Sequence, residues 1–248
     1  MQNIGMRVSL RHGFWALNLQ EVFVLGASWI ALALAVLPQA APPARVEAPK
    51  AALEISLERK TTAGKVEAMA ADHVFEPGEV IRFRVKSEYD GYLYVMDQGS
   101  SGRFSTVFPS ADAGGNNRVG RGQSYLIPAT EEGWFQVEGP AGFDVLYFLL
   151  SPGPIVPPST ASFTAPGPAS SLRPRCNDAI FRARGECTDA TAGPAAVPKD
   201  APLPAPIAPI AGAASRDITV IKQKDSVTVG ADGGKTAPVI YTFRLAHH

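Results

Sequence analysis

The chain has 248 residues with a net charge of zero, and 46% of its residues are hydrophobic. This length and hydrophobic content are typical of one folded domain with appendages. A nucleic-acid-binding protein would normally carry a basic excess, so the balanced charge argues against that class.

The first predicted element is an apolar run at residues 22–37, which follows Arg7 and Arg11. A basic region, an apolar run and small residues after it are typical of a secretory signal. The run is long for a signal and slightly short for a membrane span, and Pro38 makes a poor cleavage site. We therefore predict a cleaved signal peptide at residues 1–40, with an uncleaved membrane anchor or a buried helix as alternatives. Either leading interpretation places the remaining chain outside the cytoplasm, in the periplasm or secreted.

The next two segments are a predicted linker and a predicted first strand. Residues 41–52 are rich in proline and alanine and lack periodicity, as expected of a spacer. Residues 53–58 then alternate strictly between apolar and polar side chains, which indicates a half-buried strand.

The stretch at residues 78–109 predicts three consecutive strands and is the centre of the expected domain. Its first strand alternates apolar residues with the basic side chains Arg82, Arg84 and Lys86. Its second strand, at residues 92–96, is apolar on both faces, as a strand inside a packed sheet would be.

Further short strands are predicted at residues 124–127, 134–138 and 144–150, separated by turn residues. Many short strands with turns at this spacing favour an all-β sandwich, immunoglobulin-like in size, over residues 53–151.

The composition changes at Pro152, because 13 of the 22 prolines fall between residues 152 and 215. We expect this Pro/Ala-rich segment to be an insertion that is mostly flexible or polyproline II-like. Strand patterns return within residues 216–248 and are too few for a separate core, so we predict that they complete the sandwich.

Several short motifs occur in a fixed order within residues 53–151. They are GEVIRF at 78–83, DGYLYV at 90–95, FP at 108–109, IP at 127–128 and GPAG at 139–142. Together they resemble the bacterial domain-of-unknown-function family 4384. The resemblance implies an extracytoplasmic accessory β-domain and brings no assigned catalytic residues with it.

Both cysteines lie in the proline-rich segment, at Cys176 and Cys187. In an oxidising compartment we expect them to form a disulfide, while free thiols and metal binding are the alternatives. The four histidines are not spaced to complete a zinc site with these cysteines.

No catalytic, cofactor-binding or metal-binding set can be assembled from the remaining motifs. The P-loop-like string at 230–236 lacks the required first glycine and the following helix, so it is interpreted as a hairpin turn. The loop at 112–117 lacks the spacing of a calcium loop, and the adjacent Glu131 and Glu132 do not make an acid–base pair. No Ser-His-Asp triad can be argued either, because His73 is the only histidine of the main domain and the sequence has no nucleophile-elbow glycine pattern.

The predicted function is therefore non-catalytic, without a cofactor, and rests on binding another cell-envelope protein. Arg82, Arg84 and Lys86 are either a solvated face or a docking stripe for an acidic partner. Tyr92 and Tyr94 are either core residues or binding anchors. The alternatives are a structural, tethering protein and, with less support, an envelope hydrolase; membrane contact is expected only through an uncleaved N-terminal segment.

Overall fold

The computed structural model describes residues 52–100, 102–110, 114–129, 133–155, 163–164, 172–205, 207–231 and 236–248. All of these residues belong to one compact unit, Val46–His248. The signal or anchor predicted at 1–40 and nearly all of the linker predicted at 41–52 lie outside them. Among the described residues, no helix combines the length and apolar character that a membrane crossing requires.

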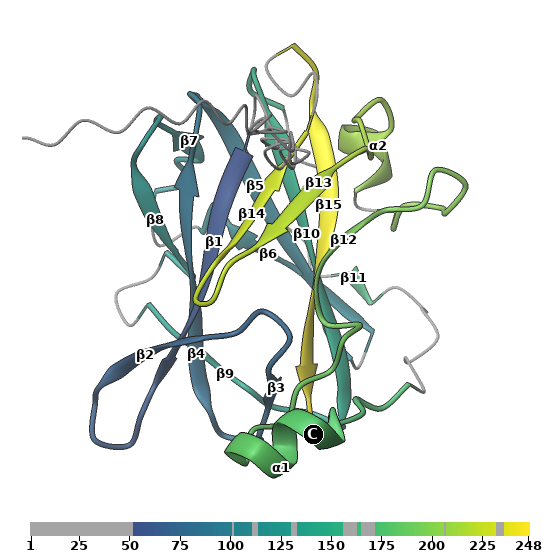
Figure 1. Ribbon diagram of the computed structural model, residues 1–248. Helices are drawn as coiled ribbons and strands as arrows, with labels where there is room; N and C mark the ends of the chain where they lie inside the picture. The colour runs from purple at the N-terminus through teal and green to yellow at the C-terminus, as the bar shows by residue number, and fades with distance from the viewer. Residues whose placement is uncertain are drawn as a thin grey trace, which may run out of the picture. The chain divides into compact units, whose positions relative to one another are not determined.

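The described strands form two sheets (Figure 1). Sheet 1 has the order β13 (Thr219–Lys222), β14 (Val227–Gly230), β1 (Ala52–Lys60), β4 (Val80–Ser87) and β8 (Ser124–Ile127), with β2 (Val66–Met69) on β1 and β9 (Phe135–Gln136) on β4. Sheet 2 has the order β11 (Phe163–Thr164), β6 (Arg103–Phe108), β5 (Gly91–Gln98), β10 (Gly142–Ser151), β15 (Val239–His247) and β12 (Gly193–Ala196), with β3 (Val74–Phe75) on β15 and β7 (Arg118–Val119) on β5. The coarse prediction of an all-β sandwich is confirmed.

Alternation along the strands determines which side chains enter the core. In β4, Ile81, Phe83 and Val85 are fully buried, while the basic residues between them point to the opposite face. The antiparallel register with β1 places Leu57 opposite Phe83 and Ile55 opposite Val85. The apolar sets of both strands therefore lie on the same, inner face of sheet 1.

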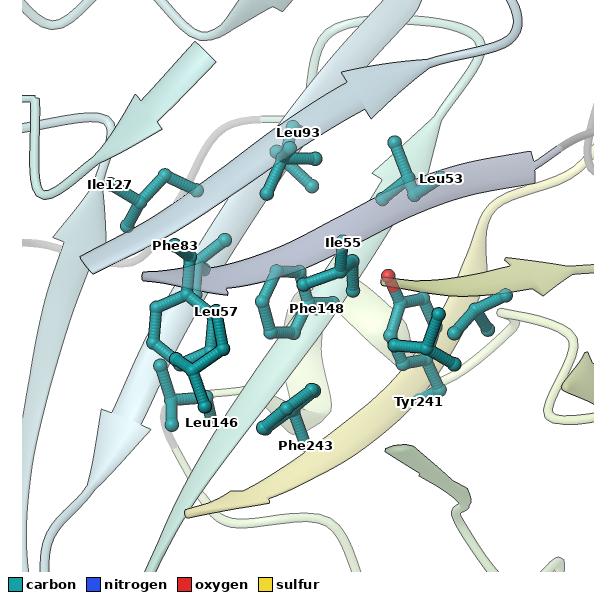
Figure 2. Close-up of a cluster of buried hydrophobic side chains, with 14 of the residues drawn as sticks. Leu53, Ile55, Leu57, Phe83, Leu93, Ile127, Leu146, Phe148, Tyr241 and Phe243 are labelled. Atoms are coloured by element: carbon teal, nitrogen blue, oxygen red, sulfur yellow. The ribbon is translucent and has the colours of Figure 1, made fainter. Parts of the chain in front are cut away.

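Aromatic rings fill the centre of the core between the two sheets (Figure 2). Phe148 of β10 stacks on Tyr241 of β15, with ring centroids 5.3 Å apart and an interplanar angle of 4°. Phe83 from sheet 1 makes edge-to-face contacts with Phe148 and Phe243, at centroid distances of 6.1 and 5.2 Å. Such edge-to-face and stacked pairs stabilise a core beyond the burial of their area.

The C-terminal strands are integral parts of both sheets. β15 lies between β10 and β12 and pairs with β10 over nine consecutive residue pairs, from Gly142–His247 to Leu150–Val239. β14 pairs with β1 at one side of sheet 1. The strand Val239–His247 thus occupies an interior position in sheet 2 although it is the last of the sequence.

The described part of the segment 152–215 differs from the mostly flexible excursion that we expected. It contains β12 and two helices, α1 (Asp178–Arg184) and α2 (Ala208–Ala211). Its apolar side chains pack against the outer face of sheet 2, in a cluster that includes Ile155, Val197, Ile207 and Ala211. Burial of this face stabilises a segment whose sequence shows no regular period.

Candidate functional site

The outer face of sheet 1 carries the basic residues that the sequence singled out. The register between β1 and β4 places Glu54 opposite Lys86 and Glu58 opposite Arg82. Arg82 Nε lies 2.6 Å from Glu58 Oε2, and Arg84 Nε lies 2.7 Å from Glu58 Oε1. Lys86 Nζ is 3.9 Å from Glu54 Oε2. Each basic residue therefore has an acidic neighbour on the adjacent strand.

This pairing adds acidic groups to the three basic residues, whose role as a solvated face or a docking stripe stays a prediction. Burial works against ionisation of Glu58, yet hydrogen bonds from Arg84 and Arg82 lower the pKa of its carboxyl group. The carboxylate is therefore held in its charged form between the two guanidinium groups. The surface presents fixed charges of both signs, so a partner with a uniformly acidic surface would meet Glu54 and Glu58 as well as the cations.

Trp134 completes this surface, and the sequence analysis did not identify it as a site residue. The guanidinium carbon of Arg82 lies 4.2 Å from the ring centroid, and Lys60 Nζ lies 5.7 Å from it. Both distances are within the range of a cation–π interaction. We call the surface formed by Glu54, Glu58, Arg82, Arg84, Lys86 and Trp134 the charged face. In sequence, the only signal for Trp134 was its position at the start of a short predicted strand.

The two tyrosines of β5 lie on the outer face of sheet 2. Tyr94 is only 3% exposed. Its hydroxyl donates a hydrogen bond to the backbone carbonyl of Ile155 and accepts one from the backbone N–H of the same residue, with an O–N distance of 2.8 Å in the second bond. Tyr92 is partly buried in the same cluster. Of the two predicted alternatives for Tyr94, a core residue or a binding anchor, its burial favours the first, and its hydroxyl holds the chain at Ile155 against sheet 2.

We predict that Tyr94→Phe will lower the free energy of unfolding by about 1–3 kcal/mol, because the carbonyl and amide groups of Ile155 lose their common partner. Urea unfolding followed by circular dichroism measures this change. A Tyr94→Phe variant that unfolds at the wild-type urea concentration would contradict the role of the hydroxyl.

Cys176 and Cys187 form a disulfide, as predicted, and join the two ends of the segment that contains α1. Closing a loop of this length contributes at most roughly 3 kcal/mol. Among the described residues, one group of potential metal ligands lies close together: Cys176, Cys187 and His248 offer atoms within 4.8 Å of one another. The disulfide uses both sulfur atoms, so these residues do not fit a thiolate metal site in this state.

A second polar group lies at the end of the sandwich where β5 ends and β10 begins. Asp144 Oδ1 accepts a hydrogen bond from Ser100 N at 2.6 Å and lies 3.4 Å from Nε2 of the buried His247. The interaction with Asp144 raises the pKa of His247, against the opposing effect of burial. Asp97 faces the same region, and its Oδ1 is buried without a hydrogen-bond partner among the described residues.

The carboxyl group of Asp97 has a strongly raised pKa, whereas the pKa values of Glu58, Glu67 and Asp189 are lowered. Burial, and then repulsion from Asp144, raise its pKa from the ordinary 3.8 to about 7, while His247 acts in the opposite direction. A carboxyl group with such a pKa in a hollow is a candidate functional residue. No sequence pattern indicates this group, because Asp97, Asp144 and His247 are brought together only by the pairing of β5, β10 and β15.

The other predicted polar motifs remain separate from this group. His73 is buried, with its ring 4.7 Å from that of Phe75 in an edge-on contact, and burial lowers its pKa. Glu131 and Glu132 lie outside the described residues, as do parts of the motifs at 112–117 and 230–236.

Comparison with known proteins bears on one part of the chain. Residues 74–154 match the family model of the Domain of unknown function (DUF4384). The match confirms the resemblance inferred from the sequence motifs. The matched segment contains the basic residues of the charged face, Trp134, Asp97 and Asp144, whereas β1, β14 and β15 lie outside it. No curated protein and no solved structure matches the chain.

Proposed function

We propose that this chain is a non-catalytic, extracytoplasmic β-sandwich module of immunoglobulin-like size that binds another cell-envelope protein through the charged face. The observation that carries the proposal is the pairing of Trp134 with Arg82 on an outer sheet surface. Tryptophan and arginine are the residue types that contribute most often to the binding energy of protein interfaces.

The two outer faces of the sandwich differ in a way that supports this choice. The outer face of sheet 2 is covered by the chain's own segment around Val197, Ile207 and Ala211. On the charged face, by contrast, the side chains of Arg84 and Lys86 are 41% and 43% exposed. The charged face is thus accessible to a partner at Arg84 and Lys86, and its two arginines are already oriented by Glu58 before binding. Preorganised side chains lose less conformational entropy on association.

The extracytoplasmic location rests on the signal-like N-terminal sequence and is supported by the disulfide between Cys176 and Cys187. Stable disulfides form chiefly in oxidising compartments. The non-catalytic character rests on the sequence, in which no nucleophile with a general base can be assembled. A structural or tethering role is the alternative, and it needs no contact with the charged face.

Photo-crosslinking tests the proposal. A photoreactive amino acid at position 84, in the charged face, should yield a defined adduct with one envelope protein when the chain is expressed in its native host. The same amino acid at Phe181, an exposed residue of α1, should not. We predict that adding Trp134→Ala reduces the adduct at position 84 at least tenfold, because truncation of an interface tryptophan often costs more than 2 kcal/mol of binding energy.

The crosslinked partner is identified by mass spectrometry, and the thermal unfolding of each variant is measured in parallel. Equal crosslinking at positions 84 and 181, or an adduct that is insensitive to Trp134→Ala in a folded variant, would contradict the proposal. The latter result would favour a tethering protein that makes no specific contact through this face.

A further inference from the structure

A hollow enters the sandwich between the two sheets at the end that contains Asp97. Its inner compartment, of about 120 Å³, is lined mainly by apolar side chains from both sheets, among them Ile81, Phe135, Val137 and Leu146. Its outer compartment, of about 340 Å³, is lined by polar residues and glycines. Both compartments share Asp97, Gln136 and Asp144, so these residues lie where the polar mouth meets the apolar interior.

The charges around the hollow come from four strands and from the segment after β9. Asp97 is on β5, Arg103 on β6, Glu138 follows β9, and Asp144 is on β10. His247, on β15, lies behind Asp144 and pairs with it. The wall of the outer compartment therefore contains three carboxyl groups and one arginine. Among the described residues, none donates a hydrogen bond to Asp97 Oδ1.

We propose that this hollow binds a primary ammonium ion that carries a short apolar body, with the ammonium group at Asp97 and the apolar body in the inner compartment. This small-ligand site is separate from the charged face and does not depend on the proposed partner binding. Asp97 lies in the wall of both compartments, and a carboxylate whose Oδ1 is buried without a donor is costly. An ammonium group in the hollow supplies hydrogen-bond donors and the opposite charge.

The order of the compartments selects the class of ligand. A cation with an apolar tail can place its tail beyond Asp97 in the apolar interior while its charge stays at the polar mouth. An apolar cavity of roughly 150 Å³ holds benzene. The inner compartment is slightly smaller, at about 120 Å³, but it shares part of its wall with the outer compartment, so the two together have room for a single ring or a short alkyl chain. A ligand whose charge lies at its innermost tip, such as an extended lysine side chain, would place that charge against Leu146 and Val137 instead.

NMR titration of the full chain with 2-phenylethylammonium at pH 8 tests the proposal. We expect saturable shifts of the amide signals of Asp97, Leu146 and Val107, with a dissociation constant of about 1 mM or below. Asp97→Asn should weaken binding at least tenfold, because the amide keeps the shape of the side chain and removes its charge. Lowering the pH from 8 to 5 should also weaken wild-type binding at least tenfold, because Asp97 takes up a proton within this range.

Two matched controls separate charge recognition from apolar adsorption. The neutral analogue 2-phenylethanol should bind at least tenfold more weakly than the ammonium ion, and Asp225→Asn, an exposed aspartate between β13 and β14, should leave ammonium binding unchanged. Absence of saturable binding overturns the proposal. Equal binding of the alcohol, or undiminished binding by a folded Asp97→Asn variant, overturns it as well.

Discussion

Replacing Phe148 with alanine should lower the free energy of unfolding by about 3–5 kcal/mol, which is a large part of the 5–15 kcal/mol that stabilises a typical domain. Phe148 is fully buried, and its ring contacts Tyr241 and Phe243 of β15 and Phe83 of β4 (Figure 2). The substitution removes one ring from contacts that join the two sheets. The surrounding strands are held by their hydrogen-bond ladders and cannot close the resulting cavity completely.

Chemical denaturation of Phe148→Ala and Phe181→Ala measures this effect against a matched control. Phe181 lies on α1 with 51% of its surface exposed, so the same truncation should change stability by no more than about 0.5 kcal/mol. Similar losses in the two variants would mean that the centre of the core is not where these aromatic contacts place it.

The strands at the centre of the fold were predictable because their burial follows a period of two. In β4 the alternation of apolar and basic residues identified the inner face directly, and in β5 the run at 92–96 indicated a strand covered on both sides. In the structure both faces of β5 are covered. The main core packs against Leu93 and Val95, and the segment after Pro152 packs against Tyr94. The sequence predicted the existence of the second cover but did not identify the segment that provides it.

That segment was not predictable because its buried residues follow no regular spacing. Ile155, Leu203 and Ile207 are single apolar side chains among prolines and small residues, and each contacts sheet 2 from a loop or a short helix. Proline restricts the conformations of the unfolded chain, so ordering such a segment costs less entropy than its lack of secondary structure suggests. Composition alone therefore indicated a flexible excursion where the fold uses a covering layer.

The polar groups were less accessible to sequence reasoning than the core. The pairing of Glu58 with Arg82 and Arg84 depends on the register of β1 against β4. An alternating pattern does not determine this register, because a shift by any even number of residues keeps the same side chains on the inner face. In the sequence, Asp97 is simply one polar residue near the end of a predicted strand. Only the order of strands in sheet 2 brings Asp144 and His247 into its surroundings.

Replacing Asp97 with asparagine should stabilise the protein by about 2–4 kcal/mol above pH 7 and have little effect below pH 4. The folded state raises the pKa of Asp97 from 3.8 to about 7, and a pKa difference of one corresponds to about 1.4 kcal/mol. The sign follows from proton linkage, since an acid whose pKa is raised binds its proton more tightly in the folded state. The wild-type protein therefore loses stability as the pH rises from about 4 to about 7, whereas the asparagine variant keeps it.

Denaturation of the wild type, Asp97→Asn and Asp225→Asn at pH 4, 6 and 8 gives the decisive comparison. Asp225 is exposed, so its substitution should change stability by no more than about 0.5 kcal/mol at any of these pH values. The contribution of His247 has the same sign in all three proteins, because its raised pKa adds stability that is lost as the pH rises, and it largely cancels in the differences. A gain for Asp97→Asn that grows with pH would mean that the wild-type protein loses stability at a carboxylate with a buried, unpartnered oxygen, which is typical of a residue retained for binding. A pH-independent difference, or a loss of stability at pH 8, would show instead that Asp97 is satisfied in the folded protein and would remove the electrostatic reason for a cation in the hollow.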